Sequence, residues 1–242
     1  MKNIIYFIFA LVPAILWIWY FKSHDKAEKE PLRLLIFSAF LGAVAVIPAA
    51  LVEVFIAKNI IPFFFPQKQI APLIIYGGFT SFLILNLLVV SIVEEVFKFL
   101  SVRLTVYNSK NFNEVSDGII YMVSAAFGFA AFENFLYFLK FGQDVIFMRS
   151  LFTPLFHASA SAIVGHYLGL AKWDKCFSKK VYLALAFSVG LHLVYDSLVF
   201  FSVLQENSLY MILAIVLLII SGYWMLRKFK ECEDIDDRCR IC

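Results

Sequence analysis

Seven stretches of this chain are long and apolar enough to cross a lipid bilayer as helices. A helix rises about 1.5 Å per residue, so a hydrocarbon core about 30 Å thick needs roughly 20 apolar residues. Hydrophobic residues make up 62% of the chain and charged residues only 16%, a balance that excludes an ordinary soluble domain. The sequence therefore predicts an all-α, polytopic transmembrane bundle of about seven to eight spans, over residues 4–21, 32–57, 79–105, 117–139, 149–171, 180–203 and 208–227.

One apolar segment, residues 58–78, is a poor candidate for a continuous helix. It contains Pro62, Pro66 and Pro72 and ends at a pair of glycines, which interrupt helices. We expect this segment to lie at the membrane interface or to re-enter the bilayer. Residues 1–230 are expected to form a single membrane domain, followed by a short cytosolic tail, residues 231–242.

The distribution of basic residues predicts the orientation in the membrane. Most of the 21 lysine and arginine residues lie in alternate connections between the spans. The positive-inside rule then places the N-terminus outside and the C-terminus in the cytosol. No small-residue cleavage pattern follows the first span, so we expect it to be an uncleaved anchor.

Ionisable side chains lie inside spans that are otherwise apolar. Each opposes insertion at mid-bilayer by roughly 2.5 to 3.5 kcal/mol, so such residues are usually buried inside the bundle and serve a function. A chain that keeps them on several helices is expected to gather them into one protected site. These residues are Glu94, Glu95, Lys98, Glu133, His157, His192 and Asp196.

The sequence VEEVFKF places two adjacent carboxylates and a lysine on the third span. Glu94 and Lys98 share a helix face, while Glu95 is rotated about 100° away. These residues could have a purely structural role, in which an ion pair between Glu94 and Lys98 makes insertion into the membrane tolerable. That role does not account for the second carboxylate, Glu95. Adjacent carboxylates in a low-dielectric site cannot easily both ionise, so the pair is suited to proton transfer.

The next three spans each add polar groups. Glu133 and Asn134 follow a run of small residues on the fourth span, where helices can approach closely. His157 lies on the fifth span, and His192 and Asp196 are four residues apart on the sixth. Each of these groups has a structural alternative as an interhelical hydrogen-bond partner, but their similar predicted depth favours one site.

Glutamate and histidine side chains suit activation of a water molecule. The motifs HExxH, GxSxG and GxGD are absent from the sequence, which disfavours the zincin, rhomboid-like serine and presenilin-like aspartyl arrangements. Two mechanisms remain open. Zinc or another divalent metal could be held by His157, His192, Glu133 and Asp196, or a metal-independent Glu/His pair could act alone. A proton- or ion-coupled transporter that uses these residues as a relay is the alternative class.

Four ordered motifs resemble those of the PrsW-type intramembrane proteases. They are EExxK from Glu94, the DG...GFAxxEN run from Asp117 to Asn134, the segment around His157, and HxxxD from His192. The resemblance covers roughly residues 30–227 and extends distantly to the CAAX prenyl proteases and the bacterial CPBP group.

The resemblance implies a peptidase with Glu94, Glu95, His157 and His192 as its catalytic residues. In the wider group one glutamate of the pair is thought to activate water, and the last-motif histidine with its i+4 partner to hold the oxyanion. That partner is Asp196 here, where prenyl proteases typically have asparagine, which favours a metal-ligand or histidine-orienting role. Lys98, Glu133 and Asn134 would support or orient these groups.

The resemblance also implies the location and the partners of the chain. It implies a multi-pass protein of the bacterial cytoplasmic membrane whose substrate is a membrane-anchored protein, and the PrsW group is linked to trimming anti-sigma factors. The lipid bilayer is the other partner, and no nucleic acid is expected. The sequence leaves the oligomeric state open.

Overall fold

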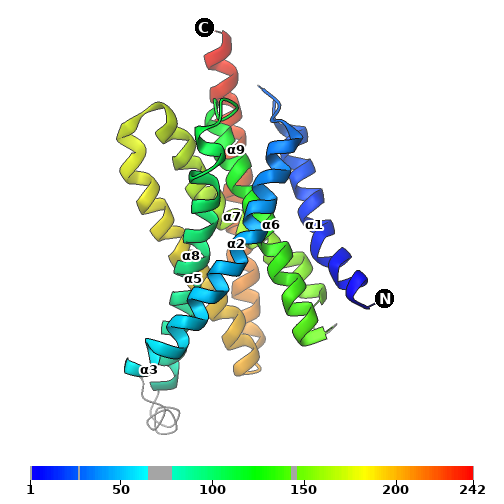
Figure 1. Ribbon diagram of the computed structural model, residues 1–242, viewed down its shortest axis with the longest axis vertical. Coiled ribbons are helices and arrows are strands. Elements are labelled where there is room, and N and C mark those ends of the chain that lie inside the picture. The colour runs from blue at the N-terminus through cyan, green and yellow to red at the C-terminus, as the bar shows by residue number, and fades with distance from the viewer. Residues whose placement is uncertain (1, 27, 65–77, 143–145, 242) are drawn as a thin grey trace.

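Seven long helices make up the described part of the chain, which comprises residues 2–26, 28–64, 78–142 and 146–241 of a computed structural model (Figure 1). These residues contain no strand, so the all-α prediction is confirmed. Each predicted span coincides with one helix to within a few residues, except that the last helix runs well beyond its span. The helices are α1 (Lys2–His24), α2 (Leu32–Asn59), α5 (Gly78–Arg103), α6 (Val115–Phe141), α7 (Ile146–Trp173), α8 (Ser178–Leu204) and α9 (Ser208–Ile241).

Two predicted segments need separate mention. The proline-containing segment 58–78 holds the short helix α3 (Ile61–Phe64), but residues 65–77 lie outside the described residues, so its interfacial or re-entrant character stays a prediction. The segment 231–242, expected as a short tail, continues α9 as helix through Ile241.

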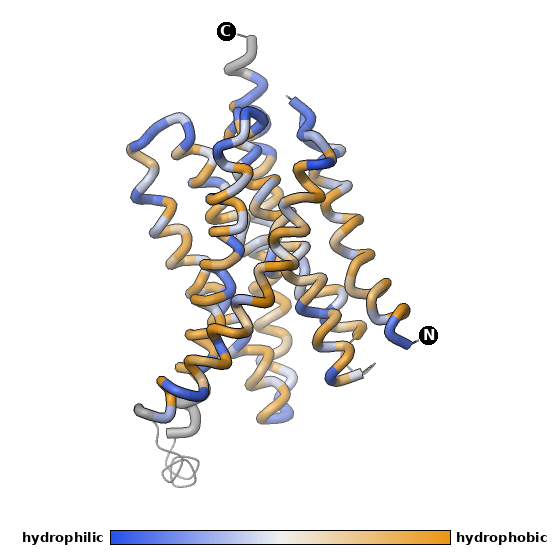
Figure 2. The backbone as a smooth tube through the Cα atoms, viewed as in Figure 1, coloured by the Kyte–Doolittle hydropathy of each residue, from blue (hydrophilic) through white to orange (hydrophobic). Residues whose placement is uncertain are grey.

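Five of the helices are long and apolar enough by themselves to cross a membrane, namely α1, α2, α6, α8 and α9. Helix α5, which carries Glu94, Glu95 and Lys98, is not among them. Helix α7 is not among them either, and it carries Arg149 and His157. Figure 2 shows hydrophobic residues along the middle of the helices and hydrophilic residues gathered at their ends. The chain is a multi-pass membrane protein.

Helix α6 lies at the centre of the bundle, between α1 and α2 on one side and α7 on the other (Figure 1). Small residues allow this close packing, as the sequence predicted. A Cβ atom on Gly128 would collide with the backbone of Ala39 on α2, and one on Gly118 would collide with the backbone of Gly165 on α7. With little hydrophobic driving force between helices in lipid, such close van der Waals contact is a main source of stability.

Two carboxylates, one on α6 and one on α9, fix the start of α6. Asp117 accepts hydrogen bonds from the backbone N–H groups of Asn113 and Glu114, both at 2.7 Å. Asp236 of α9 accepts from the N–H groups of Val115 and Ser116, at 3.0 and 2.9 Å. These carboxylates satisfy donors that have no partner inside the helix, and they hold α6 and α9 in register.

Candidate active site

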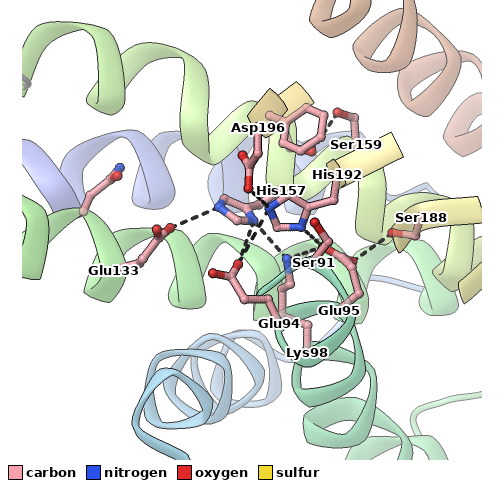
Figure 3. A network of polar contacts seen from close by, with 12 residues as sticks. Ser91, Glu94, Glu95, Lys98, Glu133, His157, Ser159, Ser188, His192 and Asp196 are labelled. Atoms are coloured by element: carbon pink, nitrogen blue, oxygen red, sulfur yellow. Dashed lines mark hydrogen bonds and ion pairs between the residues drawn. The ribbon is translucent and has the colours of Figure 1, made fainter. Parts of the chain in front are cut away.

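The ionisable residues predicted from the sequence meet in one cluster inside the bundle (Figure 3). They come from four helices whose packing brings the side chains together. Five of them are buried, whereas the side chain of Glu133 is 14% exposed and that of Asp196 is 28% exposed. Helix α5 supplies Glu94, Glu95 and Lys98, α6 supplies Glu133, α7 supplies His157, and α8 supplies His192 and Asp196.

Three residues form the centre of this cluster. Oε2 of Glu94 lies 4.0 Å from Nδ1 of His157 and 3.9 Å from Nε2 of His192. The two imidazole rings are nearly perpendicular, with centroids 5.1 Å apart. Oε2 of Glu94 is buried and has no hydrogen-bond partner in the structure. A buried carboxylate oxygen without a partner is costly, so its direction toward two imidazoles makes this position a candidate site for a ligand or a reacting group.

The outer nitrogen of each imidazole faces a carboxylate. Nε2 of His157 lies 3.2 Å from Oε2 of Glu133, and Nδ1 of His192 lies 2.9 Å from Oε1 of Glu95. An ionised carboxylate only accepts hydrogen bonds, so each outer nitrogen carries the proton when the ring is neutral. The inner nitrogens, Nδ1 of His157 and Nε2 of His192, face Glu94, and they also contact Lys98 at 2.9 Å and Asp196 at 3.3 Å, respectively.

The second glutamate of the pair has all its hydrogen-bonding capacity directed to neighbouring residues. Oε1 of Glu95 accepts from Lys98 and His192, and its Oε2 accepts from the hydroxyl of Ser188 at 2.8 Å. A Glu94–Lys98 ion pair was one possibility from the sequence, but the Lys98 ammonium contacts Glu95 and also lies 2.9 Å from Nδ1 of His157.

Asp196 contributes from the more exposed edge of the cluster. Its Oδ2 lies 3.3 Å from Nε2 of His192, the inner nitrogen of that ring. Next to it, Phe156 and Tyr195 stack with ring centroids 3.8 Å apart, and Phe156 also contacts the ring of His192. The aromatic pair restricts the rotamer of His192, so the side chain is fixed by packing as well as by hydrogen bonds.

The residues present fit a divalent metal ion. One ligand atom from each of Glu94, His157 and His192 lies within 4.8 Å of the other two. A carboxylate with two imidazoles is a donor set of catalytic zinc sites, and an outer carboxylate on each imidazole is the usual support for metal-binding histidines. Of the four metal ligands predicted from the sequence, His157 and His192 belong to this group, whereas Glu133 and Asp196 lie outside it. The third ligand atom of the group is a carboxylate oxygen of Glu94.

Three residues near the site escaped the sequence analysis. Ser188 bonds Glu95, Arg149 bonds Glu133 at 2.8 Å, and Glu53 of α2 interacts electrostatically with Glu133 and His192. Arg149 and Glu53 are charged residues inside or at the end of apolar stretches, which is the signal that identified the other site residues. Ser188 has no comparable signal, because serine is common in membrane helices.

One histidine of the spans lies outside the cluster. Nδ1 of His166 on α7 lies 3.3 Å from Sγ of Cys232 on α9, and its ring packs against Tyr167 and Trp224. This histidine therefore contributes to the packing of α7 against α9.

A multi-pass helical bundle that encloses a buried Glu/His centre is the architecture of an intramembrane hydrolase. Residues 30–221 match the model of the PrsW family intramembrane metalloprotease. This match covers most of the chain, so the chain belongs to that family and is a protease. The resemblance predicted from the four motifs is confirmed.

Curated relatives support the same assignment. Protease PrsW of Bacillus subtilis (strain 168) is 31% identical over 93% of this chain and 94% of its own length. Protease PrsW of Halalkalibacterium halodurans is 27% identical over 94% of this chain and 96% of its own length. Protease PrsW of Clostridioides difficile (strain 630) is 26% identical over 93% of this chain and 90% of its own length. No solved structure matches the chain significantly.

Proposed function

We propose that this protein is an intramembrane endopeptidase that hydrolyses a peptide bond of a membrane-anchored protein with water activated at the centre of Glu94, His157 and His192. The observation that carries the proposal is the buried, unpartnered Oε2 of Glu94, which lies 4.0 and 3.9 Å from the inner nitrogens of the two imidazoles. The class of substrate follows from the family, and a single-span anti-sigma factor is the substrate that the resemblance implies.

Glu94 is the carboxylate that takes part in the reaction. Glu95 is occupied by Lys98, His192 and Ser188, whereas Glu94 has an oxygen free for water. In the proposed reaction the water oxygen forms a bond to the scissile carbonyl carbon while Glu94 accepts a proton of that water. The carbon–nitrogen bond then breaks, and Glu94 returns the proton to the leaving amine.

Both histidines are arranged to act as ligands. With its proton on the outer nitrogen, each ring has an inner nitrogen that can accept a cation in place of the contact that Lys98 or Asp196 makes there in the structure. Glu94, His157 and His192 would hold zinc or another divalent ion, with Glu94 binding through one carboxylate oxygen and accepting the proton at the other, and with Glu95 and Glu133 orienting the two rings. When bound, such an ion polarises the scissile carbonyl and makes a coordinated water more acidic.

The N-terminus is placed outside and the C-terminus in the cytosol in this proposal. The structure supports it because the α1–α2, α5–α6 and α7–α8 connections lie at the same end of the bundle as the C-terminus (Figure 1). These are the lysine- and arginine-rich connections of the sequence, which the positive-inside rule assigns to the cytosol.

Cleavage of a single-span substrate by the purified, reconstituted protein tests the proposal. Glu94→Gln and His157→Ala are expected to abolish cleavage, while His24→Ala, which changes an exposed histidine at the end of α1, is expected to retain it. Chelation should remove activity together with bound metal, and zinc should restore it. Full proteolysis by the Glu94 and His157 variants would refute the site assignment.

The same preparation distinguishes the transporter alternative, which membership of a protease family disfavours. Proteoliposomes that take up protons in response to a substrate and never cleave a peptide would show that the cluster is a relay. Cleavage without proton uptake is the result that the proposal requires.

A further inference from the structure

Arg149, in the first turn of α7, is held by three side chains of α6. Its Nη2 donates to Oε1 of Glu133 at 2.8 Å, and its Nε donates to Oδ1 of Asn134 at 2.9 Å. The guanidinium carbon lies 3.6 Å from the ring centroid of Tyr137. The amide of Asn134 also donates to the backbone carbonyl of Arg149 at 3.1 Å. Two hydrogen bonds and a stacked ring therefore fix both the position and the plane of the guanidinium.

The carboxylate of Glu133 connects this arginine to the centre. One oxygen of Glu133 accepts from Arg149, and the other lies 3.2 Å from Nε2 of His157. A carboxylate fixed at one oxygen by a planar donor has little freedom to turn its other oxygen away from the imidazole. The position of Arg149 is thereby transmitted through Glu133 to the ring of His157.

We propose that Arg149 is a positioning residue that locks Glu133 onto Nε2 of His157 and so keeps Nδ1 of His157 directed toward Glu94. This inference deepens the proposed function and rests on it. Arg149 does not contact the centre itself, so its effect on the reaction passes through Glu133 and His157.

The charges of the cluster support this role. Glu53 and Glu94 lie close enough to Glu133 to repel its carboxylate. Of the basic side chains in the described ranges, Lys98 and Arg149 contact this cluster, and Lys98 is occupied by Glu95 and His157. Without Arg149 the Glu133 carboxylate would lose its countercharge and turn toward the more exposed side.

Nuclear magnetic resonance of the imidazole nitrogens tests the proposal without relying on proteolysis. The chain has only four histidines, so protein with 15N-labelled imidazoles gives few signals, and His157→Gln identifies those of His157. The wild-type protein should show His157 protonated at Nε2. Arg149→Met should move these signals toward a mixture of tautomers, and Arg149→Lys, which keeps the charge without the planar fork, should fall between the two.

Kinetics provide the second measurement. Arg149→Met is expected to lower kcat by up to the about 10- to 100-fold that loss of an outer partner of a ligating histidine, here Glu133, usually costs, with KM changed less than about threefold. Arg149→Lys should recover part of kcat. Glu133→Gln should change the His157 signals in the same way, which keeps the test decisive if Arg149→Met fails to fold.

A matched control separates this role from a structural one. Arg227 forms an exposed ion pair with Glu231 on α9 at 2.9 Å, and Arg227→Met should leave both the His157 signals and kcat unchanged. Wild-type signals for His157 in Arg149→Met, with kcat within about twofold, would overturn the proposal. A wild-type protein with the expected His157 signals but no peptidase activity would refute the proposed function and still support the positioning role.

Discussion

Oε1 of Glu95 lies 2.9 Å from Nδ1 of His192, so the second glutamate of the pair orients an imidazole and does not face the centre. Its neighbour Glu94 points an unpartnered oxygen at the inner nitrogens of both histidines. The angle of about 100° between successive residues of a helix produces this difference. In the proposed reaction, the two adjacent carboxylates therefore have separate roles: Glu94 accepts the proton and Glu95 orients His192.

Replacing each glutamate by glutamine should separate these roles. Glu94→Gln removes the group that accepts the proton, so kcat should fall about 10²- to 10⁴-fold while thermal stability stays near that of the wild-type protein. Glu95→Gln should lower kcat as well, through loss of the His192 orientation, but it should also lower the free energy of unfolding, because Lys98 is fully buried beside it.

Cleavage rates and thermal unfolding of the two variants in the same detergent check this prediction. Equal loss of stability in both variants would show that Glu94 also has a structural partner. Full activity in Glu94→Gln would remove it from the reaction.

The Glu95–Lys98 ion pair should show strong energetic coupling. Breaking a buried pair by removing one partner costs about 3–5 kcal/mol, because the other charge stays buried. The double variant Glu95→Gln/Lys98→Met leaves neither charge, so its destabilisation should be smaller than the sum of the single changes, with a coupling of about 0.5–3 kcal/mol.

The exposed Arg227–Glu231 pair of α9 is the matched control, since surface pairs contribute about 0–1 kcal/mol. Unfolding free energies of the four proteins of each cycle measure the two couplings. Additive effects at Glu95 and Lys98 would mean that the ion pair contributes no more than the surface pair.

The sequence predicted the helices well because hydrophobicity alone determines where a chain can cross lipid. The end of the last helix was missed for the same reason. Residues 231–241 are polar, and their helix is held by contacts that no local pattern reveals, such as the bonds from Asp236 to the start of α6. A resemblance based on four motifs predicted the family, which the family match confirms.

The cluster was predictable from sequence in its members but not in its contacts. Charged residues inside apolar helices are few, so Glu94, Glu133 and His157 were readily found. Which nitrogen faces which carboxylate depends on helix rotation and rotamers, which a sequence does not encode locally. This is why a Glu94–Lys98 pair was considered whereas Lys98 lies at Glu95, and why the contact between Glu133 and Arg149, on different helices, was missed.

The packing of α6 against α2 predicts opposite outcomes for two glycine substitutions. A Cβ atom on Gly128 would collide with the backbone of Ala39, whereas one on Gly190 of α8 would meet nothing within 4 Å. Gly128→Ala should therefore destabilise the protein by about 1–3 kcal/mol, as overpacking does. Gly190→Ala should be neutral or slightly stabilising, because alanine is the better helix former.

Unfolding of both variants in a mixed-micelle titration measures the difference. A Gly128→Ala protein as stable as Gly190→Ala would mean that α2 and α6 can separate without cost. The close packing of α6 would then contribute little to the fold.

Buried carboxyl groups in the α1–α2 connection predict that stability depends on pH. Asp25 is 1% exposed, and its Oδ2 accepts a hydrogen bond from the backbone N–H of Glu30 at 2.7 Å. The pKa of Asp25 is raised from its ordinary value to about 6, mainly by burial. Glu30 and Glu114 contribute to this rise, and the Glu30 backbone hydrogen bond and Lys22 oppose it. Burial also raises the pKa of the Glu30 carboxyl.

A carboxyl group with a raised pKa binds its proton more tightly in the folded state than in the unfolded state. Its contribution to stability is therefore complete below pH of about 4 and is lost as the pH rises through about 6. The free energy of unfolding should fall between pH 4 and pH 7, with Asp25 accounting for about 1–3 kcal/mol of the decrease.

The isosteric variant Asp25→Asn provides the direct measurement. It keeps an oxygen for the Glu30 N–H but carries no charge, so it should be more stable than the wild-type protein at pH 8, with a shallower decrease between pH 4 and pH 7. Asp174→Asn is the control, because that carboxyl is exposed and the backbone N–H of Cys176 lowers its pKa, so its loss should not reduce the decrease. An Asp25→Asn protein with the full wild-type pH dependence would show that Asp25 ionises without cost in the folded state.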